Sequence, residues 1–71
     1  MWKVYKYNGN YIQGDLVSKH SSESAALKSA KKNIGYTFTE KKKVNNEVRI
    51  WLDSVNHTPI GVIIKNTRGS N

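Results

Sequence analysis

The chain has 71 residues with no cysteine, and its twelve Lys and Arg against five Asp and Glu give a formal net charge of +7. A chain this short forms one domain and buries only about 60% of its unfolded surface, so a deep catalytic cleft is not expected. Without cysteine there are no disulfides or thiolate metal sites, and the longest apolar run, residues 62–64, is too short to span a membrane. The composition favours a cytoplasmic protein with a polyanionic partner, most often nucleic acid.

Two strands are expected before the helix. Residues 2–7 alternate and are rich in aromatic and β-branched side chains, and residues 11–19 form the second strand. Between them, residues 8–10 read Asn-Gly-Asn, which is a hairpin signal. We expect these three residues to form the loop, because Val4 then pairs with Gly14 and the apolar side chains share one face. That inward set is Trp2, Val4, Ile12 and Leu16.

Residues 21–35 carry the signals of a helix. Ser21 or Ser22 can cap its start, Glu23 suits the positive end of the helix dipole, and Gly35 suits the left-handed residue that ends a helix. The residues that fall on one stripe are Ala26, Leu27, Ala30 and Ile34. Two of these four are alanines, so we expect the helix to lie close against a sheet.

Three more strands are expected at residues 36–43, 47–55 and 60–65. A two-residue loop at Asn45 and Asn46 would place Lys41 and Lys43 on the inward face, beside an apolar set. A three-residue loop at 44–46 instead sends both lysines outward and pairs Phe38 with Leu52, so we favour it. The inward set on these strands is then Phe38, Val48, Ile50, Leu52, Ile60, Val62 and Ile64.

The expected fold is α+β, with the order β-β-α-β-β-β and a mostly antiparallel sheet that packs one helix on one face. We expect residues 1–66 to form this single compact domain and residues 67–71 to be a short polar tail. Strand order cannot be derived from the alternation.

The outer face of this sheet is the expected binding surface, because no second helix is available to cover it. Interleaved rings and cations on an open sheet suit single-stranded nucleic acid, since bases stack on the rings and phosphates pair with the cations. The candidate residues are Lys3, Tyr5, Tyr7, Tyr11, Lys41, Lys43, Arg49 and Trp51. Each feature also has an alternative interpretation. The rings can be ordinary strand residues, and residues 41–43 can form a solvated sheet edge that blocks aggregation.

A second class of function remains open. The same surface could dock on an acidic protein, as an inhibitor or adaptor would, and it could also form a homodimer. We expect no enzyme, metal or cofactor. His20 and His57 have no close Cys, Asp or Glu to complete a ligand set, and the serines near His20 are typical helix caps.

Overall fold

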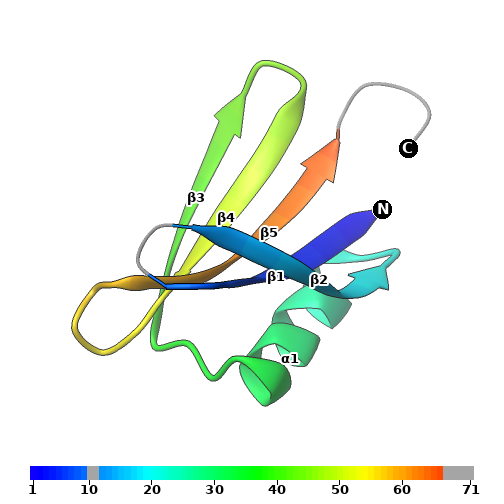
Figure 1. The fold of residues 1–71 in the computed structure, drawn as a ribbon. Coiled ribbons are helices and arrows are strands. Elements are labelled where there is room, and N and C mark those ends of the chain that lie inside the picture. The colour runs from blue at the N-terminus through cyan, green and yellow to red at the C-terminus, as the bar shows by residue number, and fades with distance from the viewer. Residues whose placement is uncertain (10–11, 67–71) are drawn as a thin grey trace.

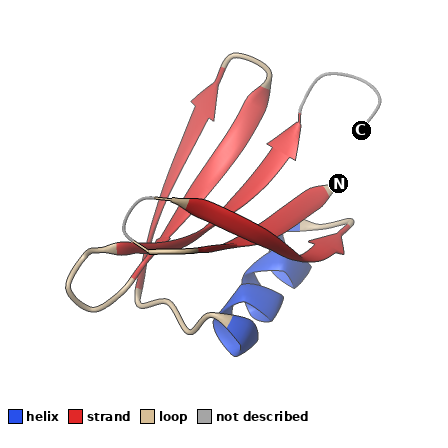
Figure 2. Cartoon of the chain, viewed as in Figure 1, coloured by secondary structure: helices blue, strands red, loops and turns tan. Residues whose placement is uncertain are grey.

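The structure is a computed structural model that describes residues 1–9 and 12–66. Its elements are β1 (Trp2–Tyr7), β2 (Gln13–His20), α1 (Glu23–Asn33), β3 (Phe38–Val44), β4 (Glu47–Asp53) and β5 (Pro59–Asn66). The strands form a five-stranded sheet in the order β2-β1-β5-β4-β3 with every neighbouring pair antiparallel (Figure 1). The helix lies against one face of this sheet (Figure 2). The expected antiparallel sheet with one helix is confirmed, and the expected tail at 67–71 lies outside the described residues.

The last strand, β5, occupies the centre of the sheet between β1 and β4. It carries three consecutive buried residues, Gly61, Val62 and Ile63. A strand that is apolar on both sides belongs where neighbours cover it on both edges and both faces. The lysine-rich β3, all of whose residues are exposed, forms one edge of the sheet instead.

The helix begins and ends as its sequence predicts. Ser22 is the N-cap, and its hydroxyl accepts a hydrogen bond from the Ala25 amide at 3.2 Å. At the other end the amides of Ile34 and Gly35 both donate to the Ala30 carbonyl, at 2.7 and 3.1 Å. Gly35 has a φ of 74°, so the expected left-handed termination is confirmed.

The helix covers only part of its face of the sheet. It packs mainly on β1 and β2 and touches β5. A helix is about 10 Å across and neighbouring strands lie about 4.8 Å apart, so one helix can cover only two or three strands. The helix side of β3 is therefore left open, whereas Ile50 and Leu52 on β4 are still buried, so a polar side chain facing the helix side of β3 stays in contact with solvent.

The core lies between the helix and the three strands β1, β5 and β4. It consists of Trp2, Val4, Ala26, Ala30, Ile50, Leu52 and Ile63, with Leu27, Ile34, Tyr36 and Val48 packed around it. Both core alanines are fully buried, which lets the helix approach the sheet closely. The expectation that Trp2, Ile50 and Leu52 are buried is confirmed. Phe38 is 40% exposed and lies on the other face, so its expected burial is wrong.

The loop between β3 and β4 has two residues, so the favoured three-residue loop is wrong. Val44 pairs with Glu47, and Asn45 takes a φ of 52°, a conformation that asparagine tolerates. Lys41 then pairs with Ile50 and Lys43 with Val48, which puts both lysines on the helix side. They remain exposed because the helix does not reach β3, so this register buries no lysine.

Two other strands depart from the expected alternation. The register between β1 and β2 shifts within Val4–Tyr7, and as a result Leu16 lies opposite Tyr5 and is 44% exposed. Ser18 takes the inward position opposite Val4, and Ile12 is also exposed. In β5, Ile63 pairs with both Val4 and Ile50 and points inward, which sends Val62 to the face away from the helix. The inward assignments of Ile12, Leu16, Val62 and Ile64 are therefore wrong.

Polar inward positions on β2 are satisfied by hydrogen bonds to one another and to the helix. The hydroxyls of Ser18 and Ser29 lie 2.9 Å apart, and His20 Nε2 lies 2.9 Å from the Ser18 hydroxyl. The Ser18–Ser29 bond joins β2 to α1 where an apolar contact was expected, and His20 supports Ser18 within β2. We interpret the serines and His20 as a structural link between the two elements.

Candidate nucleic-acid interface

The outer face is the face of the sheet that points away from α1, and a row of cations crosses it. Lys3 pairs laterally with Lys19 on β2 and with Ile64 on β5. Arg49 on β4 pairs with Ile64 and with Lys42 on β3. Antiparallel partners share a face, so these side chains lie side by side. We call this set the cationic row; it consists of Lys19, Lys3, Arg49 and Lys42, with Ile64 at its centre.

A second row runs beside the cationic row, two residues along β1, β5, β4 and β3 and three residues along β2, where the register shifts. It consists of Leu16, Tyr5, Val62, Trp51 and Glu40, paired in that order from β2 to β3, and we call it the aromatic row. Two residues along a strand correspond to about 6.6 Å. Tyr5 and Trp51 therefore stand beside the cations at roughly the distance that separates neighbouring side chains on one strand face.

The rings of Tyr5 and Trp51 lie on either side of Val62 on the outer face. Val62 is fully buried, although it points away from the helix. Its lateral neighbours on the outer face are Tyr5 and Trp51, both of which are half-buried. These large side chains are the ones placed to cover it, which matches the ordinary strand role considered for them. Their remaining exposed surface is what a ligand could contact.

Acidic side chains accompany two of the four cations. Arg49 Nε donates to the Glu47 carboxylate, and Lys42 Nζ lies 3.5 Å from Glu40. In the described part of the chain, neither Lys3 nor Lys19 lies within ion-pair distance of a carboxylate. The β1–β2 half of the row is therefore the more strongly positive half.

A hollow of about 320 Å³ lies next to Trp51, lined by Glu40, Lys42, Trp51, Asp53, His57 and Pro59. At this end of the outer face the rings of Phe38 and His57 are stacked, with centroids 4.2 Å apart and planes inclined by 14°. Phe38 opposes Asp53 across the β3–β4 ladder. The hollow offers space for a flat group against Trp51.

The structure brings together five of the eight residues predicted for the site. Lys3, Tyr5, Tyr7, Arg49 and Trp51 share the outer face. Lys41 and Lys43 lie on the opposite face, which corrects their assignment, and Tyr11 lies outside the described residues. Lys19 and Lys42 were missed. The two-residue loop at Asn45 and Asn46 was the signal that would have placed Lys42 opposite Arg49.

The helix side of the molecule is more strongly basic than the outer face. Lys41 and Lys43 on β3, Lys65 on β5 and Lys28, Lys31 and Lys32 on the helix all belong to it. Glu23, at the start of the helix, lies 3.0 Å from Lys41 and is the acidic residue of this surface with an ion pair. Lys65 Nζ lies 5.2 Å above the Trp2 ring, which shields that ring from solvent.

Comparisons with protein-family models, with curated proteins and with solved structures found no match to this chain. Over the described ranges 1–9 and 12–66 no three His, Cys, Asp or Glu side chains are grouped to hold a metal ion. In the same residues no helix has the length and apolar character needed to cross a membrane. The interpretation of the site therefore depends on its own geometry.

Proposed function

We propose that the protein binds single-stranded nucleic acid on the outer face of its sheet. The observation that carries this proposal is the cationic row lying beside the aromatic row across all five strands. A single strand carries phosphates along one side and bases along the other, so it can place phosphates on one row and bases on the next.

Each row has a defined role in this proposal. Lys19 and Lys3 stand on neighbouring strands about 4.8 Å apart, as do Arg49 and Lys42, and Ile64 separates the two pairs. All four cations contact phosphates of the strand. Trp51 supplies the main stacking surface, because the hollow beside it can accept a base. Tyr5 stands two strands away in the same row and supplies a second ring. No side chain in either row requires a particular base, so binding is expected to be independent of sequence.

The carboxylates of Glu47 and Glu40 lower the affinity of this surface for phosphate. Glu47 engages Arg49 and Glu40 lies near Lys42, so each competes with phosphate for its cation. The Lys42–Glu40 pair is exposed, with about 60% of each side chain accessible, and exposed pairs are weak. A phosphate can therefore replace Glu40 at little cost, whereas the half-buried Arg49 is held more firmly by Glu47.

The test is titration of the protein with labelled single-stranded oligonucleotides of random sequence at several salt concentrations. Phosphate contacts release counterions, so the affinity should fall with salt, with a log–log slope of about −0.7 per phosphate contact. Four contacts predict a slope of about −3. Quenching of tryptophan fluorescence should accompany binding. Trp2 is 8% exposed and capped by Lys65, so a bound oligonucleotide should reach Trp51 and not Trp2. The quenching should therefore disappear in Trp51→Leu. If no oligonucleotide binds at low salt, the proposal fails.

A further inference from the structure

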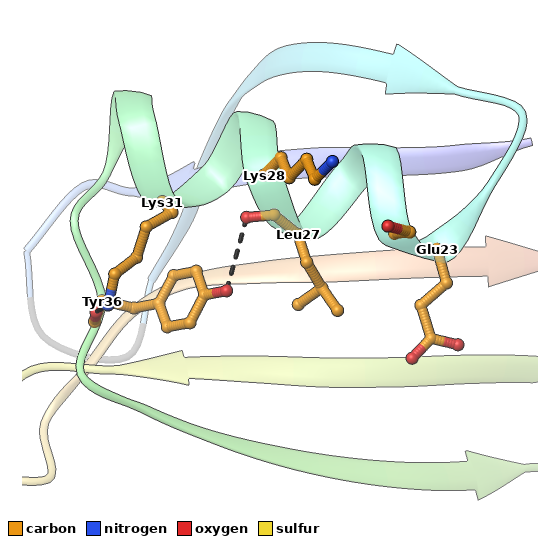
Figure 3. Close-up of a pocket in the computed structure, with 6 residues that line it drawn as sticks. Glu23, Leu27, Lys28, Lys31 and Tyr36 are labelled. Atoms are coloured by element: carbon orange, nitrogen blue, oxygen red, sulfur yellow. Dashed lines mark hydrogen bonds between the residues drawn. The ribbon is translucent and has the colours of Figure 1, made fainter.

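A groove lies on the helix side of the molecule, along α1 and the loop that follows it. Its cavity measures about 600 Å³ and is lined by Glu23, Ser24, Leu27, Lys28, Lys31 and Tyr36. In Figure 3 the Leu27 side chain points from the helix toward the strands, and the Tyr36 side chain runs beside the helix with its hydroxyl toward the Leu27 carbonyl. Leu27 and Tyr36 each pack against the core and also line the groove, so the inner part of the groove is apolar.

Lysines surround this apolar surface. Lys28 and Lys31 line it from the helix, and Lys41 and Lys43 stand on the uncovered helix side of β3. Glu23 is tied to Lys41 at 3.0 Å, and this pair bridges the helix and β3. The pair is more than a third exposed, so it is screened and can exchange partners. The charge around the groove therefore favours an anionic occupant.

The lining of the groove favours a peptide over nucleic acid. The Tyr36 hydroxyl donates to the Leu27 carbonyl at 3.3 Å, and Lys31 Nζ lies 4.7 Å above the Tyr36 ring. Lys31 covers one face of this ring and Tyr36 also packs against the core, so the ring is poorly placed to stack on a base. An apolar wall beside Leu27 is instead suited to an apolar side chain, a group that nucleic acids do not offer. Lysines around such a wall match carboxylates.

From this arrangement we infer that the groove binds an acidic, amphipathic segment of a partner protein. The apolar side chain of the segment fills the space against Leu27 and Tyr36, and its carboxylates pair with Lys28, Lys31 and Lys43. The site is separate from the outer face, so this inference does not depend on the proposed binding of nucleic acid. It gives the molecule two faces with different partners.

The test uses three labelled probes: a short peptide of glutamate alternating with leucine and phenylalanine, a polyglutamate peptide of equal charge, and a single-stranded oligonucleotide. The amphipathic peptide should bind the protein at least about tenfold more tightly than polyglutamate, because only it can fill the apolar wall. In NMR titrations its addition should shift the signals of the Leu27 methyls and the Tyr36 ring, and leave those of Leu16 on the outer face unchanged.

Lys28→Glu and Lys32→Glu form a matched pair for the same test. Both lysines are exposed on α1 and both substitutions change the net charge equally, but only Lys28 lines the groove. Lys28→Glu should weaken the amphipathic peptide by about tenfold or more, whereas Lys32→Glu should change it by about twofold or less. Equal binding of the two peptides, equal effects of the two substitutions, or no peptide binding would each overturn the inference. So would an oligonucleotide that shifts Leu27 and displaces the peptide.

Discussion

Lys41 Nζ lies 3.0 Å from Glu23 Oε1, and this contact joins the edge strand β3 to the first turn of the helix. It places Lys41 on the helix side of the sheet. Alternation along β3 then places Lys42 on the outer face, where it lies opposite Arg49. The lysine run at 41–43 therefore serves both faces, with Lys42 completing the cationic row and Lys41 and Lys43 standing beside the groove.

Leu52→Ala should destabilise the fold by about 2–5 kcal/mol, because Leu52 is fully buried and its loss leaves a cavity in the core. Chemical denaturation followed by circular dichroism measures the difference in the free energy of unfolding. Val55→Ala is the control, since Val55 is 68% exposed in the turn before β5 and should change stability by less than about 0.5 kcal/mol. Similar losses for the two variants would contradict the assignment of the core.

Gly35→Ala should lower the stability by about 1–2 kcal/mol, because alanine is strained at the observed φ of 74°. Gly35→Asn should cost less, since asparagine tolerates the left-handed region. The melting temperatures of the two variants compare these costs directly. An alanine variant as stable as the parent protein would show that the helix does not end in this conformation.

The fold could be predicted from the sequence where the signals are local, and not where they depend on how far the helix reaches. Ser22 and Gly35 mark the ends of the helix through their own hydrogen bonds and backbone preferences, so no tertiary information was needed. Lys41 and Lys43 were assigned outward because a lysine facing the helix side was assumed to be buried. One helix about 10 Å across cannot cover five strands, so a lysine on the helix side of β3 stays exposed and pays no penalty for burial.

The residues of the candidate site could be predicted from the sequence only where alternation along a strand is clear. Tyr5, Arg49 and Trp51 were placed correctly because they alternate with clearly apolar neighbours on β1 and β4. Lys19 was missed because the expected pairing of Val4 with Gly14 left it beyond the end of the first strand. Gly14 signals the irregularity of this hairpin, since a Cβ there would lie 2.5 Å from the Lys6 carbonyl oxygen, and the register does shift between Val4 and Tyr7. Val62 was assigned inward because it is as apolar as Ile63, and hydrophobicity alone does not distinguish the two faces of a central strand.

Trp51→Leu should weaken binding of a single-stranded oligonucleotide by about 1–3 kcal/mol, the usual contribution of one stacked base. Leucine keeps an apolar side chain beside the buried Val62, so the fold should survive the change. Fluorescence anisotropy at fixed salt measures the affinity, and the slope of affinity against salt should stay unchanged because stacking releases no counterions. An unchanged affinity would remove Trp51 from the interface.

Glu47→Gln should strengthen binding of the same oligonucleotide. The substitution removes the carboxylate that engages Arg49, and so frees the guanidinium for phosphate. Affinity should rise because the phosphate at Arg49 no longer competes with this carboxylate, and the slope should stay at about −3 because the number of phosphate contacts is unchanged. Glu23→Gln is the matched control, because it makes the same change in charge on the helix side. Equal gains for both variants would mean that only net charge matters.

The most direct test of the outer-face interface compares Lys42→Ala with Lys41→Ala. The two lysines are adjacent and exposed, but Lys42 belongs to the cationic row and Lys41 faces the helix side. The affinity of each variant for a single-stranded oligonucleotide is measured across a range of salt concentrations. Lys42→Ala should flatten the log–log slope by about 0.7, the value of one phosphate contact, and Lys41→Ala should leave it near that of the parent protein. A flattened slope in Lys41→Ala with an unchanged slope in Lys42→Ala would contradict the interface and place nucleic acid on the other face.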